Sequence, residues 1–122
     1  MYGIGGPISG IPSTWDLIDQ IGQHRYSGVV RFEWDDAKDE INQKKHGVAF
    51  EVASRVFADP NVLEYIERVV EGEERWHAIG FASGTVLFLT VVHTHVGDKV
   101  VRIISAREAT SRERKLYADS IF

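Results

Sequence analysis

The sequence predicts an α+β domain in which helices pack on an antiparallel sheet of about five strands, in the order β-α-α-β-β-β-β-α. Between Pro60 and Ser105, apolar residues alternate with polar ones, which is typical of strands with one buried face. Before Pro60 they recur at helical spacing, and the last segment begins with a helix-capping signal. Helices and antiparallel strands in separate blocks of a chain indicate an α+β fold.

The first elements of the domain are a strand and two helices. Residues 30–34 alternate apolar and polar side chains, as a half-buried strand does. Asp35 then caps a helix that runs to about His46 and ends at Gly47, because glycine takes the left-handed conformation after a helix most easily. Apolar residues at helical spacing predict a second helix over 49–57.

Four further strands follow Pro60, and a helix closes the chain. The strands are predicted over 62–67, 75–82, 85–93 and 99–105. Turns at Ser83-Gly84 and over 95–98 make the last three an antiparallel meander. The closing helix starts with a capping box, in which Thr110 and Glu113 satisfy each other's backbone donors.

These turns also predict which side chains share a face of the sheet. A two-residue hairpin at Ser83-Gly84, with the turn after it, predicts one polar row made of His77, Thr90 and Arg102, with Arg75 beside it. The opposite face carries the apolar residues that a sheet turns toward its packed side. A slip of one residue in the second turn would move Arg102 to that apolar face.

Composition limits the setting of the chain. Its 122 residues, of which 43% are hydrophobic, fit one compact domain. The absence of cysteine excludes disulfides and cysteine nucleophiles and favours a reducing compartment, so the cytoplasm is expected. No signal peptide or membrane-spanning stretch is evident, so no membrane is expected as a partner. The net charge of −4 argues against a protein that coats nucleic acid.

The charge is unevenly distributed along the chain. Residues 99–118 contain six lysines and arginines but two acidic residues. A basic end on an acidic chain fits a local phosphate site or an acidic partner, and a solvated basic helix explains it equally well.

Residues 1–28 are predicted to be an N-terminal extension of a domain that spans 29–122. The first twelve residues are rich in glycine, proline and serine and show no period. Ser13 is a suitable N-cap, and apolar residues at intervals of three predict a short amphipathic helix over 14–24. This extension adds no core and is expected to dock on the domain or on a partner.

The arginines of the polar row suit a phosphate site. Arg75 and Arg102 can bind a phosphodiester, because a guanidinium offers paired donors and keeps its charge. The alternative is that they form ion pairs with neighbours such as Glu74 or Glu113. His77 alone indicates little, since a lone strand histidine is usually a polar side chain at the edge of a core.

Two helices offer further candidates. Lys38 and Lys45 share one stripe of the first helix, and His46 ends it. Histidine can act as a general acid or base and lysine can neutralise phosphate charge, although a solvated helix face explains the same stripe. Tyr117 lies one turn after Glu113 and can relay a proton or simply anchor the last helix to the sheet.

No cofactor and no metal are expected. His93 and His95 flank one turn without a carboxylate at ligand spacing. The chain also contains no glycine-rich phosphate loop, Ser-His-Asp constellation or dinucleotide fingerprint.

Two sets of motifs resemble the BrnT family of type II toxins over about residues 30–118. In the first half the matching residues are Phe32–Asp35, Lys38, Asn42, Lys45–Gly47, Phe50, Ala53, Val56-Phe57 and Asp59. In the second half they are Glu74-Arg75, Gly80, Arg102–Arg107, Ala109, Arg112–Arg114 and Tyr117. The order and spacing of the paired motifs make the resemblance specific.

The resemblance implies a fold similar to RelE toxins and a metal-independent ribonuclease that cleaves RNA and blocks translation. It also implies neutralisation by a BrnA antitoxin with a DNA-binding segment. The complex would repress its own operon, so operator DNA is expected as a partner only through that complex.

The resemblance also gives the candidate residues roles. The scissile phosphate is assigned to three arginines, Arg75, Arg102 and Arg107. Proton transfer is assigned to the first helix, with His46 and either Lys38 or Lys45, and Tyr117 supports them. The alternatives are a non-catalytic module whose basic C-terminal end docks an acidic partner or represses DNA within a complex, and a structural domain with solvated arginines.

Overall fold

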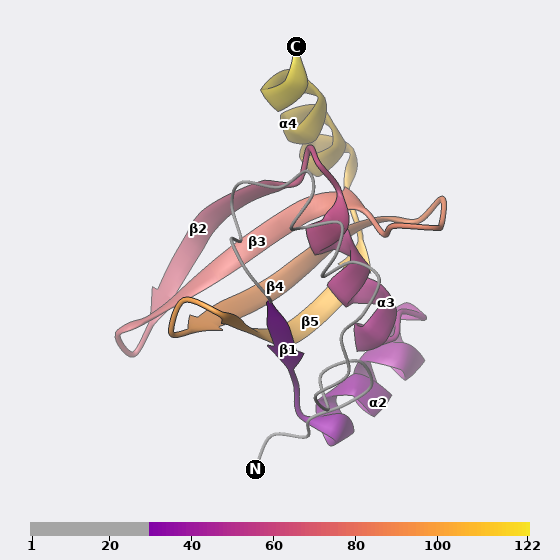
Figure 1. The fold of residues 1–122 in the computed structure, drawn as a ribbon. Coiled ribbons are helices and arrows are strands. Elements are labelled where there is room, and N and C mark those ends of the chain that lie inside the picture. Colours follow the sequence, from indigo (N-terminus) through magenta and orange to yellow (C-terminus); the bar gives the residue numbers. More distant parts are fainter. Residues whose placement is uncertain (1–29) are drawn as a thin grey trace.

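A computed structural model describes residues 30–122 and contains one five-stranded sheet with helices on it (Figure 1). The strands are β1 (Arg31–Glu33), β2 (Leu63–Val70), β3 (Glu73–Phe81), β4 (Phe88–Val96) and β5 (Val100–Glu108). The helices are α2 (Asp36–His46), α3 (Phe50–Ser54), the 3-10 helix η2 (Arg55–Ala58) and α4 (Ser111–Ile121). The predicted α+β order is confirmed. The helix expected over 14–24 lies outside the described residues.

The strand order across the sheet is β1-β5-β4-β3-β2. Strands β3 to β5 form the predicted antiparallel meander, and β2 extends it by a further antiparallel pairing with β3. Strand β1 pairs with the far side of β5 in the parallel direction. The long stretch of chain between β1 and β5 allows this parallel pairing, so the sheet is mostly rather than wholly antiparallel. Among residues 30–122, no helix has the length and apolar character needed to cross a membrane.

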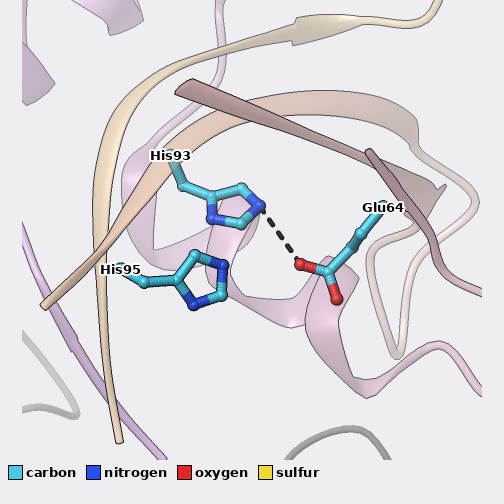
Figure 2. A group of neighbouring side chains, drawn as sticks. All are labelled: Glu64, His93 and His95. Carbon is cyan, nitrogen blue, oxygen red and sulfur yellow. Dashed lines mark ion pairs between the residues drawn. The ribbon is translucent and has the colours of Figure 1, made fainter. Parts of the chain in front are cut away.

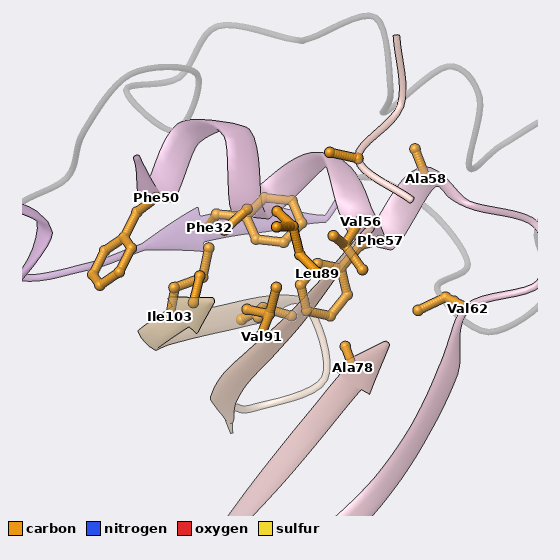
Figure 3. Packing of buried hydrophobic residues seen from close by; sticks show 14 of the residues in the cluster. Phe32, Phe50, Val56, Phe57, Ala58, Val62, Ala78, Leu89, Val91 and Ile103 are labelled. Atoms are coloured by element: carbon orange, nitrogen blue, oxygen red, sulfur yellow. The ribbon is translucent and has the colours of Figure 1, made fainter. Parts of the chain in front are cut away.

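The core fills the space between the sheet and the helices α3 and η2 (Figure 3). Phe32 of β1 packs against Phe57 of η2, with ring centroids 5.3 Å apart. Leu89, Val91 and Ile103 meet them from the sheet, and each is at most 1% exposed. Burying a side chain of this size stabilises the fold by roughly 1.5–3 kcal/mol, so this layer holds the helices on the sheet.

Helix α2 begins and ends as its sequence predicts. The Asp35 carboxylate accepts hydrogen bonds from the backbone N–H groups of Ala37 and Lys38. Gly47 ends the helix with φ of 72°, a left-handed conformation that glycine adopts without steric cost.

Asn42 joins α2 to the edge of the sheet. It is 5% exposed, and its amide group donates to the carbonyls of Val48 and Ala106 and accepts from the Ala106 N–H. Since β1 pairs with β5 only over Val100–Arg102, Asn42 satisfies edge groups of β5 farther along the strand. It therefore replaces part of a neighbouring strand.

Both turns of the meander differ from those that the sequence predicted. The prediction of a two-residue hairpin loop at Ser83-Gly84 is wrong, because the last paired residues of β3 and β4 are Phe81 and Phe88. Thr85 explains the longer loop, since its hydroxyl donates to the Ala82 carbonyl and accepts from the Leu87 N–H. The next turn lies later in the chain than predicted, because the residue pair next to it is Val96 with Val100. Strand β4 therefore continues to Val96.

We expect Asn42→Ala to lower the free energy of unfolding by about 2–4 kcal/mol, because it leaves buried backbone groups of Val48 and Ala106 without partners. Urea denaturation measures this change. Gln43→Ala is the matched control, since Gln43 is an exposed amide on the same helix, and it should cost less than about 0.5 kcal/mol. Equal losses for both variants would contradict the role given to Asn42.

Candidate active site

The face of the sheet opposite the core carries the arginines predicted from the sequence. We call this the polar face and define it by Arg75, His77, Arg102, Ser105 and Arg107, which the strand register places on one side. The strand pairings differ from the predicted ones by an even number of residues, so Arg75, His77 and Arg102 stay on the predicted side. The prediction that Arg75, His77 and Arg102 share a face is confirmed.

The polar row predicted from His77, Thr90 and Arg102 is wrong, because each of these side chains occupies a different row. Arg102 pairs with Thr94, and Arg75 lies one residue before Trp76, the partner of His93. Arg75 and Arg102 therefore flank Thr94 at one end of the polar face.

The other two rows contain the rest of the polar residues. The middle row runs Tyr65, His77, Val92, Ser105, and the last row places Thr90 beside Arg107. Neighbouring rows on one face are roughly 7 Å apart along a strand, so His77 lies between the two arginine rows.

A bulge in β5 brings Arg107 onto the same face as Arg102. These residues are five positions apart, so a regular strand would place them on opposite faces. The pairing shifts between Ser105, opposite Val92, and Ile103, opposite His93, which leaves Ile104 as an extra residue. Arg107 therefore lies within β5, although the sequence predicted that this strand ends at Ser105.

Each arginine of the polar face has a carboxylate partner. Arg102 pairs with Glu33 on the neighbouring strand, with both Nε and an Nη 2.6 Å from one oxygen. Arg75 Nε lies 3.3 Å from Glu73 Oε1. Arg75 and Arg102 thus form ion pairs, as the alternative interpretation of the sequence expected, but with Glu73 and Glu33 as partners. The charges of these arginines are therefore largely balanced.

Glu113 holds Arg107 in a fixed geometry. Its two oxygens accept hydrogen bonds of 2.7 and 2.8 Å from the two Nη atoms of Arg107. The Thr90 hydroxyl and the Thr110 N–H also donate to this carboxylate. The Arg107 hydrogen bonds, with those of the two threonines, lower the pKa of Glu113 to about 2, so it stays ionised.

Tyr65 and His77 form a contact in the middle row. The Tyr65 hydroxyl lies 3.2 Å from His77 Nδ1. Burial lowers the pKa of His77, although Glu67 and Glu113 oppose that effect. Burial and the nearby Glu113 raise the pKa of Tyr65, which keeps its phenol protonated. At neutral pH, this pair is a neutral imidazole oriented by a neutral phenol.

The basic residues of α2 line a separate hollow beside β5. Lys38, Lys45 and His46 surround a space of about 170 Å³ together with Ile104 and Ser105. Ser105 also belongs to the middle row, so this hollow adjoins the polar face at the edge of β5. The structure thus brings together the three α2 candidates, in a hollow that none of the three polar-face arginines lines.

Tyr117 is placed differently from the other candidates. It is 8% exposed, and its hydroxyl donates a 2.7 Å hydrogen bond to Asp59. Asp59 also accepts from the Phe81 N–H, and it fits only because Gly80 has no Cβ, which would lie 2.8 Å from the carboxylate. Burial and Asp59 raise the pKa of Tyr117. These contacts favour the interpretation that Tyr117 anchors α4.

Comparison with known proteins identifies the family. The family described as the ribonuclease toxin BrnT of type II toxin-antitoxin systems matches residues 34–113, more than half of the chain. The chain belongs to the BrnT family. The crystal structure of the Brucella abortus ribonuclease toxin BrnT aligns with a TM-score of 0.49 and 22% identity, over 68% of this chain and 96% of that one. No curated protein sequence matches significantly.

Two residues of the polar face in this BrnT family member were missed by sequence reasoning. Tyr65 gave no signal because the hairpin between β2 and β3 went unrecognised; its turn residues Glu71 and Gly72, with φ of 50° and 80°, are typical of a type I′ turn. Glu33 was noted only within the Phe32–Asp35 motif of the family resemblance, and not as a partner of an arginine. Its pairing with Arg102 depends on the parallel contact between β1 and β5.

We expect Glu113→Gln to lower stability by about 2 kcal/mol near neutral pH, because Arg107 loses its charged partner. The depressed pKa adds stability above about pH 4.5, the usual pKa, and this is lost as pH falls toward about 2. Urea denaturation across this range should show a weaker pH dependence in the variant. Glu51→Gln, which breaks the half-buried i,i+4 pair with Arg55, is the control and should change little. Identical pH profiles for wild type and Glu113→Gln would refute this assignment.

Proposed function

We propose that this BrnT family member is a metal-independent endoribonuclease that inhibits translation in the cytoplasm, and that the polar face is its active site. The observation that carries the proposal is the position of His77, held by Tyr65 between two arginine rows. Arginines can bind the scissile phosphate on both sides of a group that moves a proton. Membership of a ribonuclease toxin family supports this reaction class.

The proposed reaction needs one proton removed and one delivered. His77, neutral because burial lowers its pKa, accepts the proton of a ribose 2′-hydroxyl. The 2′-oxygen attacks phosphorus, the bond from phosphorus to the 5′-oxygen breaks, and that oxygen takes up a proton. The products are a 2′,3′-cyclic phosphate and a 5′-hydroxyl, with no metal or cofactor required by this balance.

The arginines stabilise the charge that develops on the phosphate. Arg75 and Arg102 lie at one end of the polar face and Arg107 at the other. The RNA phosphates would share these guanidinium groups with Glu33, Glu73 and Glu113. Guanidinium donors set in place before the reaction lower the barrier without further reorganisation.

The hollow on α2 extends the same proposed site. His46 and Lys45 are exposed beside Ser105, and Lys38 completes the basic rim. His46 is the proposed donor of the proton to the leaving 5′-oxygen, with the lysines neutralising a flanking phosphate. Tyr117 supports the site by fixing α4, which carries Glu113.

A BrnA-like antitoxin is the proposed protein partner, and operator DNA is met only through that complex. The family belongs to type II toxin-antitoxin systems, in which a protein antitoxin covers the toxin. An acidic antitoxin segment suits the polar face, because it would exchange with the carboxylates now paired to the arginines.

We expect Arg102→Ala to slow RNA cleavage in excess chelator by roughly 100-fold or more, because a charged donor to the phosphate is lost. Gel analysis of a labelled RNA measures the rate, and circular dichroism checks the fold. Arg102→Lys keeps the positive charge but loses the paired donors, so its cleavage rate should lie between those of the wild type and Arg102→Ala.

Arg55→Ala is the matched control for this experiment. Arg55 also carries a carboxylate partner, Glu51, but it belongs to η2 on the core side of the sheet. Its removal should leave cleavage unchanged. Equal rates for wild type and Arg102→Ala would show that the polar face is not the site.

We expect cleavage to decline as pH falls through the pKa of His77, because only the neutral imidazole accepts a proton. Burial lowers that pKa below its usual 6.5, so the acid limb of the rate profile should lie below this value. His77→Asn should reduce the rate and remove this limb, whereas Tyr65→Phe should shift it. An acid limb that persists unchanged in His77→Asn would assign the base elsewhere.

A second candidate function is a non-catalytic binding module that docks an antitoxin and acts in autorepression. The observation that favours it is the carboxylate partner found on each of Arg75, Arg102 and Arg107. If purified protein leaves RNA intact while binding an acidic partner through these arginines, this function stands and cleavage does not.

A further inference from the structure

Glu64, His93 and His95 form a second polar cluster, on the core side of the sheet (Figure 2). Each offers one ligand atom, and these atoms all lie within 4.8 Å of one another. His93 Nε2 is 3.3 Å from Glu64 Oε1. Two imidazoles and a carboxylate are a common set of transition-metal ligands in proteins.

This cluster could not be expected from the sequence, because Glu64 lies far from the two histidines along the chain. Glu64 comes from β2, two strands away from the histidines on β4. Its partner on β3 is Ala78, whose own partner on β4 is Val91. The small side chain of Ala78 lets the Glu64 carboxylate reach across β3 toward His93.

His93 is the least satisfied polar side chain of this cluster. It is completely buried, and neither of its ring nitrogens makes a hydrogen bond to any of residues 30–122. It lies against Glu64, whose side chain is 3% exposed, without the geometry of a hydrogen bond. Buried polar groups nearly always have hydrogen-bond partners, so this imidazole points to a bound ligand.

Aromatic rings enclose the cluster on the inner side. Phe57 packs edge-on against His93 with centroids 4.8 Å apart, and Trp76 packs against His95 at 5.1 Å. Such walls exclude water, which strengthens the attraction between a cation and the Glu64 carboxylate.

The outer side of the cluster opens to solvent. His95 is exposed and lines a hollow of about 450 Å³ with Glu73, Glu74 and Trp76. A cation can approach through this hollow, and Glu74 makes it attractive to positive charge.

We propose that Glu64, His93 and His95 bind one divalent transition-metal ion of the zinc class. Imidazole nitrogens favour such ions over magnesium and calcium, which prefer all-oxygen sites. Three protein ligands leave the fourth tetrahedral position to a water molecule in the hollow. Ligand atoms around zinc lie about 3.4 Å apart, and His93 Nε2 and Glu64 Oε1 already have a spacing of 3.3 Å.

The ion would join β2 to β4 across β3. Because the cluster and the polar face lie on opposite sides of the sheet, the ion stabilises the fold and takes no part in the proposed cleavage. This proposal is therefore independent of the ribonuclease function, and a chelator tests the two separately.

The test is zinc binding to the metal-free full chain, in competition with a chromogenic chelator. We expect one zinc ion per chain and a rise in the melting temperature, since binding to the folded state alone stabilises it. His95→Asn and Glu64→Gln should each weaken binding by roughly 100-fold or more. His46→Gln removes an exposed histidine elsewhere and should leave binding unchanged.

Cobalt provides a second readout, because its visible absorption reports tetrahedral coordination by protein ligands. His95 is exposed, so His95→Asn should keep the wild-type circular dichroism spectrum while losing this absorption. Absence of zinc binding by the wild type, or unchanged binding in either variant, would overturn the proposal and leave a buried ion pair.

Discussion

The extra residue Ile104 in β5 is the constraint on which the rest of the structure depends. A regular strand would send Arg102 and Arg107 to opposite faces, and would separate Ile103 from Ala106 in the same way. The bulge instead keeps Ile103 and Ala106 in the core and both arginines on the polar face. Without it, a guanidinium would be buried in the core, which costs far more than the bulge.

The edge of β5 sets how the helices meet this face. Strand β1 covers that edge over three residues, and beyond it the Asn42 amide satisfies the backbone of Ala106. Helix α2 is therefore held beside Ser105, where Lys38 and His46 line a hollow. A single buried amide thus positions basic side chains that belong to a different segment from the arginines.

The two sides of the sheet handle charge in different ways. On the polar face each arginine has a carboxylate within its reach, and the proposed RNA phosphate would share the arginine with that carboxylate. On the core side, Glu64 and His93 are packed against aromatic rings, which keep water away from them. The first arrangement suits a substrate that binds and leaves, and the second suits a tightly held ion.

The order of the elements, the cap at Asp35, the helix end at Gly47 and the face of Arg102 could be predicted from the sequence, because alternation and capping depend on neighbours along the chain. The pairing of strands could not, since a bulge or a longer loop changes which residues meet without changing the pattern of either strand. The contact of Tyr65 with His77 and the approach of Glu64 to His93 both depend on that pairing.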